Sequence, residues 1–162
     1  MASEAPRVGI LMGSKNDWDA MQAAEKVLGE LGVACDVRVI SAHRTPERLA
    51  GFLREAEEGS IELLICGAGM SAHLAGVTAA HTLMPVLGVP LSSGELNGLD
   101  ALLSTVNMPP GIPVGTLGIG KSGAKNAGLF AAAILATHDP ALRERLAKFR
   151  EAQSAAVPER PE

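Results

Sequence analysis

Aromatic side chains are scarce in this chain. Its 162 residues include no Tyr, and the aromatic residues are Trp18, Phe52, Phe130 and Phe149. Proteins that bind single-stranded nucleic acid stack the bases on aromatic rings, and a flavin ring needs a similar surface. The composition therefore argues against both kinds of ligand.

Runs of basic residues and long apolar runs are also missing. The chain has 14 Lys and Arg against 18 Asp and Glu, a formal net charge of -4, which argues against binding to nucleic acid or a membrane surface. The longest apolar stretch, residues 127–136, is too short to span a bilayer. The opening residues, MASEAPRVGI, do not read as a secretory signal. We therefore expect a cytoplasmic protein with no membrane and no nucleic-acid partner.

Cysteine is limited to Cys35 and Cys66, which lie far apart in the sequence. Without a secretory context we expect both thiols to be reduced and to pack as small hydrophobic residues. The chain has no CxxC or HExxH motif, and its four His residues lack the spacing of metal ligands. We therefore expect no metal site.

Short apolar runs alternate with segments of helical periodicity along the whole chain. This alternation predicts an α/β fold with a parallel sheet of about five strands and right-handed crossovers. We expect one catalytic domain over residues 1–162, with residues 1–6 and about 156–162 frayed. The expected strands are residues 8–12, 33–40, 61–66, 85–89 and 113–119, and the expected helices are about 18–31, 46–58, 74–80, 99–106, 125–137 and from 140 onward.

The expected helix over residues 126–137 is apolar or small almost all round. Such a helix must be buried on more than one side, and a chain of this size has little interior for it. A subunit interface is the better place, so we expect a homo-oligomer.

Two polar turns each follow an expected strand and open an expected helix. The first, Gly13 to Asp17, offers backbone N–H groups and the side chains of Ser14 and Asn16 as a phosphate cradle. Ordinary helix capping also explains this turn, and from this turn alone it is the better interpretation. Asp17 only accepts hydrogen bonds when ionised, which suits ribose hydroxyls better than a phosphate.

The second turn, Ser41 to Pro46, carries more chemistry. Arg44 offers a planar guanidinium for a phosphate, and Ser41 can add a hydroxyl. His43 can exchange a proton near neutral pH. Since ligands bind at the carboxyl ends of strands in open α/β sheets, the two turns together predict a site for a sugar phosphate that gains or loses a proton.

A third turn, from Gly67 to Leu74, follows the next expected strand. Gly67 and Gly69 flank Ala68 and would let a substrate approach the backbone closely. His73 is either a second polar group of the site or simply a residue at a helix start, and the residues alone do not separate these interpretations.

Six segments in this order and spacing resemble the class I PurE family, the N5-carboxyaminoimidazole ribonucleotide mutases of purine biosynthesis. They are GSKNDW, SAHRTP, GAGMSAHLAG, PVLGVP, LLSTVNMPPGIPVGT and IGKSGAKNAG. The resemblance spans roughly residues 8–152, and six motifs in register are far more specific than any one of them.

This resemblance implies a three-layer α/β/α flavodoxin-like fold, a homo-octamer with sites at subunit boundaries, and an isomerase without metal or organic cofactor. It implies that the carboxylate on the exocyclic amine of N5-carboxyaminoimidazole ribonucleotide moves to C4, which gives 4-carboxy-5-aminoimidazole ribonucleotide in the pathway to IMP. The family's route is decarboxylation to aminoimidazole ribonucleotide and trapped carbon dioxide, followed by attack of C4.

The same resemblance assigns roles to individual residues. His43 would carry the proton, and the substrate would be bound by Ser14, Asn16, Asp17, Ser41 and Arg44. The third turn would close over the ring and the carbon dioxide with Ala68, Gly69, His73 and Leu74.

The chain departs from the family pattern in both turns that matter. Asn16 stands where the family has Ser, Ala75 where it has Pro, and Met70 and Ser71 where Gly-Ala is common. Asn16 still donates a hydrogen bond, whereas Ala75 loosens the third turn. Phosphate binding should therefore survive, whereas the looser third turn affects the retention of carbon dioxide and leaves room for direct carboxylation.

Two other functions compete with the mutase. One is an aminoimidazole ribonucleotide carboxylase that uses free carbon dioxide, as in the class II branch of the family, although AHLAG favours class I. The other is a non-catalytic nucleotide- or flavin-binding module of flavodoxin type, in which His43 would have no task.

Overall fold

The computed structural model describes residues 5–161, which form an α/β fold around a five-stranded parallel sheet. The strands are β1 (Val8–Met12), β2 (Cys35–Val39), β3 (Leu63–Gly69), β4 (Val86–Leu91) and β5 (Gly115–Thr116). They lie in the order β2-β1-β3-β4-β5, and every pair is parallel. This is the strand order of flavodoxin-like folds, with the switch in direction between β1 and β3. The predicted fold class is therefore confirmed.

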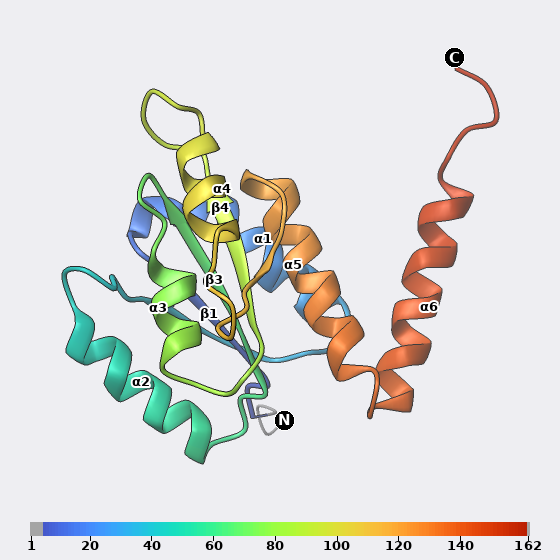
Figure 1. Cartoon of the computed structure of the whole chain (residues 1–162). Coiled ribbons are helices and arrows are strands. Elements are labelled where there is room, and N and C mark those ends of the chain that lie inside the picture. The colour runs from blue at the N-terminus through green and yellow to red at the C-terminus, as the bar shows by residue number, and fades with distance from the viewer. Residues whose placement is uncertain (1–4, 162) are drawn as a thin grey trace.

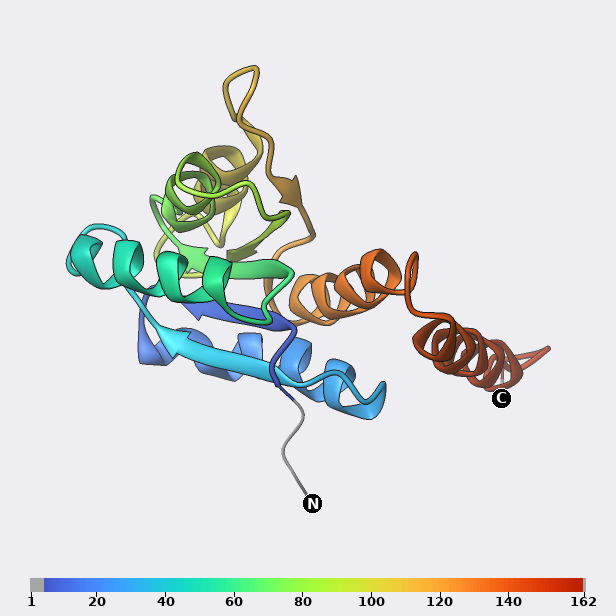
Figure 2. The same cartoon turned by 90° about the horizontal axis from the view of Figure 1, so that it is seen from below.

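The helices cover both faces of this sheet. They are η1 (Lys15–Asp17), α1 (Trp18–Glu30), α2 (Pro46–Glu58), α3 (Leu74–Ala80), α4 (Leu99–Val106), α5 (Gly120–Leu135) and α6 (Pro140–Ala155). Helices α1 and α5 pack together on one face, and α2 and α3 lie on the other (Figure 1). Helix α6 projects away from the body of the molecule (Figure 2).

Successive side chains of strand β1 point to opposite faces of the sheet. Val8, Ile10 and Met12 belong to the core beneath α1 and α5, whereas Leu11 belongs to the core beneath α2 and α3. All of β1 is buried, as expected for a parallel strand covered on both faces. A side chain at Gly9 would overlap the end of the Leu64 side chain and press on Phe52, so both would have to shift to admit one.

Several boundaries differ from the sequence-based expectation. Strand β2 begins two residues late, because the Val33 N–H donates to the Leu28 carbonyl and closes α1 instead. Strand β3 runs on to Gly69, and β4 continues through Pro90 to Leu91. Helix α5 begins at Gly120, five residues before the expected start.

The strands β4 and β5 explain how a proline fits inside the sheet. Strand β5 is only two residues long and pairs with Leu87 and Gly88, so β4 is an edge strand at Pro90. A missing N–H leaves no ladder hydrogen bond unmade on an edge. Pro90 therefore does not end the strand, contrary to expectation.

Both ends of the chain include residues that the structure does not describe. Of the residues expected to fray, 1–4 and 162 lie outside the described part. Pro6 accepts a hydrogen bond from the Ser60 hydroxyl, and residues 156–161 follow α6 without a further helix or strand. No helix within residues 5–161 is long and apolar enough to cross a membrane.

Both thiols are free, as expected. Cys66 is buried, whereas Cys35 is only half-buried. Burial raises the pKa of each thiol to about 12, so neither is a thiolate at neutral pH. A nucleophilic role for either cysteine is therefore disfavoured.

Candidate active site

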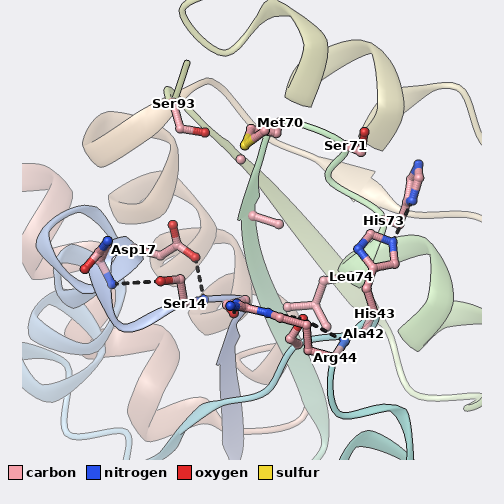
Figure 3. Close-up of a pocket in the computed structure, with 15 residues that line it drawn as sticks. Ser14, Asp17, Ala42, His43, Arg44, Met70, Ser71, His73, Leu74 and Ser93 are labelled. Atoms are coloured by element: carbon pink, nitrogen blue, oxygen red, sulfur yellow. Dashed lines mark hydrogen bonds between the residues drawn. The ribbon is translucent and has the colours of Figure 1, made fainter.

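A cavity of about 460 Å³ opens where β1, β2 and β3 end. All ten site residues expected from the sequence line it, from the three turns that follow these strands (Figure 3). Five further residues also line it: Gly13, Ala42, Met70, Ser71 and Ser93. The parallel sheet thus brings together three segments that are about 30 residues apart in sequence.

The first turn is a helix cap whose residues also face the cavity. The Asn16 N–H donates to Ser14 Oγ at 3.3 Å, and the Ser14 N–H donates to Asp17 Oδ2 at 2.8 Å, so Ser14 and Asp17 form a capping box at η1. The capping interpretation is therefore correct for the backbone. One carboxylate oxygen of Asp17 is engaged in this cap, which fixes the side chain in place beside the cavity.

Arg44 belongs to the second turn, and its side chain reaches the first turn. Arg44 Nη2 donates to the Gly13 carbonyl at 2.8 Å, and Arg44 Nε donates to Ser41 Oγ at 3.3 Å. Both acceptors are neutral, so the guanidinium charge is oriented without being neutralised. Thr45 is the residue before α2, but its hydroxyl bonds Ser41 rather than capping the helix.

The two histidines of the site contact each other directly. His43 Nε2 lies 2.9 Å from His73 Nδ1, and the rings meet edge to face with centroids 5.0 Å apart. One proton must lie between these two nitrogens for the hydrogen bond to form, which leaves Nδ1 of His43 for a ligand. His73 is therefore both the residue at the start of α3 and a polar group of the site.

The third turn supplies the apolar side of the cavity. Ala68 and Gly69 are the last residues of β3, and Leu74 is the first residue of α3. Gly67 does not line the cavity: the side chain of Met21 occupies the space where its own side chain would lie. The expectation that Gly67 lets a substrate approach is thus wrong, since this glycine serves the packing of α1 on the sheet.

The charges of the cavity are unequal. Asp17 has a raised pKa because burial disfavours its charged form, and the Ser14 N–H and the Arg44 charge only partly offset that cost. Figure 3 shows Ser14 and Asp17 on one side of the cavity and the two histidines on the other, with Arg44 between them. An elongated ligand with an anionic group near Arg44 and hydroxyls near Asp17 would match this arrangement.

Sequence reasoning missed Ser93 as a lining residue. Ser93 follows β4, and its hydroxyl occupies the space where a side chain on Gly69 would lie. The signal was available, because a polar residue after a fourth parallel strand belongs at the same edge of the sheet. The mistaken end of β4 at Pro90 concealed it.

Comparison with known proteins places this geometry in a family. Residues 7–156 match the family described as AIR carboxylase. The chain belongs to this family. The match takes in every strand and every helix of the described residues, and all residues of the cavity.

Relatives within the AIR carboxylase family are similar over almost their full length. The N5-carboxyaminoimidazole ribonucleotide mutase of Escherichia coli K12 is 55% identical over 156 residues, which are 96% of this chain and 92% of that protein. The mutase of Pyrococcus abyssi is 57% identical over 146 residues, 90% of this chain and 83% of that protein. The crystal structure of Treponema denticola PurE superposes with a TM-score of 0.84 at 29% identity, covering 93% and 92% of the two chains.

Proposed function

We propose that this protein is an N5-carboxyaminoimidazole ribonucleotide mutase, which forms 4-carboxy-5-aminoimidazole ribonucleotide in purine biosynthesis. The observation that carries this proposal is the cavity in which Arg44, His43 and Asp17 converge, in a chain more than half identical to named mutases. An anion contact, a proton carrier and a hydroxyl acceptor are the groups that this substrate requires.

The substrate phosphate would lie against Arg44. Its guanidinium is held by two neutral oxygens and so keeps its full charge for a ligand. The hydroxyls of Ser14 and Ser41 and the amide of Asn16 add donors on the same side of the cavity. Asp17, fixed by its cap, would accept hydrogen bonds from the ribose.

His43 would first donate a proton to the substrate and then accept one from it. The bond between N5 and the carboxylate carbon breaks, carbon dioxide leaves, and the His43 imidazolium delivers its proton to N5. C4 then forms a bond to the carbon of carbon dioxide, and the proton on C4 returns to His43. No proton is gained or lost overall, so one general acid–base group is sufficient.

His73 would position His43 for this exchange. With His43 Nε2–H donating to His73 Nδ1, the first ring is held in one tautomer and one orientation. Its Nδ1 then faces the substrate. The hydrogen bond also gives the imidazolium a partner for its second N–H while the charge is present.

The carbon dioxide would be held by the apolar part of the cavity. Ala68, Gly69 and Leu74 offer small or apolar groups next to the histidines. Excluding water from this part keeps the freed carbon dioxide beside C4. The proposal involves no metal or organic cofactor.

We further propose that the protein is a homo-oligomer, an octamer by its family resemblance, located in the cytoplasm. Helix α4 supports an oligomer, because its side chains Leu99, Leu103 and Val106 are each about half exposed in one chain. Phe130 on α5 is also 48% exposed. Exposed apolar side chains of this kind are common at subunit interfaces, which supports the proposal. Light scattering should find no stable monomer, and a folded, active monomer would contradict the proposal.

Product analysis tests the function. The purified protein is incubated with N5-carboxyaminoimidazole ribonucleotide, and separately with aminoimidazole ribonucleotide plus bicarbonate. We expect the 4-carboxy product to form rapidly from the first substrate and only slowly from the second. A protein that acts on neither would be a binding module.

A carboxylase is the second candidate, because the family that the chain matches is described as AIR carboxylase. In that case aminoimidazole ribonucleotide plus bicarbonate would be the faster pair, and N5-carboxyaminoimidazole ribonucleotide would give no product beyond its spontaneous breakdown. The two candidates share the phosphate and ribose contacts, so only the substrate comparison separates them.

A further inference from the structure

A second cavity adjoins the one that forms the candidate active site. Its volume is about 450 Å³, and it shares four lining residues with the first cavity: Gly13, Ser14, Ser41 and Arg44. Three of these are the proposed phosphate contacts, and the fourth, Gly13, accepts a hydrogen bond from Arg44. The second cavity therefore lies beside the phosphate end of the candidate site.

The residues that line only the second cavity add positive charge to this end. They are Lys15 from η1 and Arg48 from α2, together with Val39 and Thr45, and among the described residues no Asp or Glu lines this cavity. Lys15 and Arg48 are both exposed. The ion pairs found within residues 5–161 include neither of them, nor Arg44. Three cations thus border one opening without a carboxylate partner.

Arg48 stands where the helix itself disfavours a cation. It is the third residue of α2, which begins at Pro46, so it lies in the first turn. The amino end of a helix carries partial positive charge, which favours an acidic residue such as the neighbouring Glu47 and opposes a basic one. A residue placed against the local preference is expected to serve a function elsewhere.

The charge of the whole molecule makes a local positive region useful. The chain has a formal net charge of -4, and the proposed substrate carries a phosphate and a carboxylate, so protein and substrate repel each other at long range. Cations gathered at the opening reverse this repulsion where the phosphate must enter. Because Lys15 and Arg48 are exposed, their effect depends on the salt concentration, as it does for charges at the rim of an interface.

We propose that Lys15 and Arg48 form a basic rim that attracts the phosphate group of the substrate toward Arg44. The ligand that the rim recognises is a phosphate monoester on a small sugar. Arg44 binds the phosphate, whereas the basic rim acts on it through the electric field. The identity of the substrate rests on the proposed function, but the attraction to a sugar phosphate can be measured without turnover.

Isothermal titration calorimetry at two salt concentrations tests the proposal. Aminoimidazole ribonucleotide is titrated into native protein and into the double variant Lys15→Gln/Arg48→Gln. Raising the ionic strength from about 0.01 M to about 1 M shortens the Debye length from about 30 Å to about 3 Å. The double variant should bind about tenfold more weakly than native protein at low salt and within about twofold of it at high salt.

A matched double variant controls for net charge. Lys26→Gln/Arg54→Gln also removes one Lys and one Arg, both exposed and outside the two cavities, from α1 and α2. It should bind within about twofold of native protein at both salt concentrations. The nucleoside without the phosphate should bind native protein and the rim variant alike. Circular dichroism should show that both double variants are folded.

Four results would overturn the inference. The first is a rim variant whose affinity depends on salt as strongly as that of native protein. The second is a weakening that persists at high salt, which would mean direct contact with the phosphate. The third is an equal loss in the matched control, which would implicate net charge alone, and the fourth is an unfolded rim variant, which would give both residues a structural task.

The inference and the proposed function can fail separately. Ribose 5-phosphate serves as a second probe, because it carries the phosphate without the imidazole. A salt-dependent loss with this probe, in a protein that forms no 4-carboxy product, would contradict the proposed function and leave the basic rim standing. Formation of the product with no effect of the rim variant on either probe would contradict the inference alone.

Discussion

Each end of the parallel sheet carries an arginine and a histidine. At the amino end their charges are paired with carboxylates, whereas at the carboxyl end they are not. At the amino end, Arg7 contacts Glu62 at 2.5 Å and Asp139 at 2.7 Å, and His138 contacts the other oxygen of Glu62 at 2.7 Å. At the carboxyl end, the hydrogen bonds of Arg44 go to the neutral oxygens of Gly13 and Ser41.

The pKa shifts of the carboxyl groups follow the same division. Burial would raise the pKa of Glu62, but the hydrogen bonds from Arg7 and His138 outweigh it, so that pKa is lowered. The Leu142 N–H and Arg7 likewise lower the pKa of Asp139. Asp17 in the cavity goes the other way, because burial outweighs its partners and raises its pKa.

This difference separates a structural cluster from a functional one. The amino-end network joins the start of β1, the start of β3 and the turn between α5 and α6, and its charges are paired within the protein. The cavity holds a cation on neutral acceptors and a carboxylate that is costly to ionise, an arrangement that a bound ligand would complete.

Replacing His43 by Asn should have the largest effect on turnover. Asn keeps some hydrogen bonding but cannot carry a proton, so kcat should fall by roughly two to four orders of magnitude. Steady-state kinetics and circular dichroism should show lost turnover in a protein that is still folded and still binds the ribonucleotide. Near-native turnover would mean that the proton travels by another route, with His73 as the next candidate.

Exchanging the two arginines for alanine should give opposite phenotypes. Arg44→Ala should weaken substrate binding by about 2 kcal/mol, roughly 30-fold, because a charge-assisted contact to phosphate is lost. Its free energy of unfolding should hardly change.

Arg7→Ala is the matched variant at the other end of the sheet. It should lower the free energy of unfolding by no more than about 1 kcal/mol, since Glu62 and Asp139 lose their contacts to Arg7 while Glu62 keeps His138, and should leave substrate affinity unchanged. Calorimetric titration measures the substrate affinity of both variants, and denaturant unfolding measures their free energies of unfolding. If the two variants changed substrate affinity and stability in the same way, the two ends of the sheet would not have the different roles described here.

Two variants of His73 should sharpen the role of the histidine contact. Asn places an oxygen near the position of His73 Nδ1 and can accept the His43 hydrogen bond, whereas Leu cannot. We expect His73→Leu to lower kcat about tenfold with little change in KM, and His73→Asn to keep most of it. Equal losses in both variants would show that His73 itself carries a proton or shapes the turn.

The smallest expected effects concern the two carboxyl groups with opposite pKa shifts. At neutral pH, Asp17→Asn should raise the melting temperature, because the ionised form of Asp17 is disfavoured in the folded state. Glu62→Gln should lower it, because folding favours ionised Glu62. Each change should be on the order of 2–4 °C or less, which differential scanning calorimetry resolves.

The pH dependence of these two contributions also differs in sign. The stabilisation from Glu62 is present above its ordinary pKa of 4.5 and is lost as the pH falls through its lowered pKa. The contribution of Asp17 runs the opposite way and becomes less favourable as the pH rises above its ordinary value of 3.8. Melting temperatures that change equally with pH in the two variants would refute these assignments.

The sequence predicted the elements that end in clear signals. Gly32, with a φ of 69°, follows the end of α1, and Pro46 stands at the first turn of α2. The alternation of apolar and helical segments also placed all three polar turns at one edge of the sheet, so every expected site residue lines one cavity. The placement of the turns depended on local periodicity and on the rule for parallel sheets, whereas the site roles of His73 and Leu74 came from the family resemblance.

The incorrect predictions concern positions whose conformation depends on contacts with distant parts of the chain. Gly67 was interpreted as a turn because the packing of Met21 against it cannot be read from local sequence. Pro90 was interpreted as a strand end because the shortness of β5, which makes that position an edge, was unknown. Met70 has a φ of 55°, a conformation that is rare for Met and that no local sequence pattern predicts.

The most direct test of the account is whether Arg44 is reserved for the substrate phosphate. Isothermal titration calorimetry would compare aminoimidazole ribonucleotide with the corresponding nucleoside, which lacks the phosphate, on native protein and on Arg44→Ala. The account predicts that the phosphate improves the affinity of native protein about ten- to a hundredfold and that most of this gain disappears in Arg44→Ala. An equal gain in both proteins would contradict it.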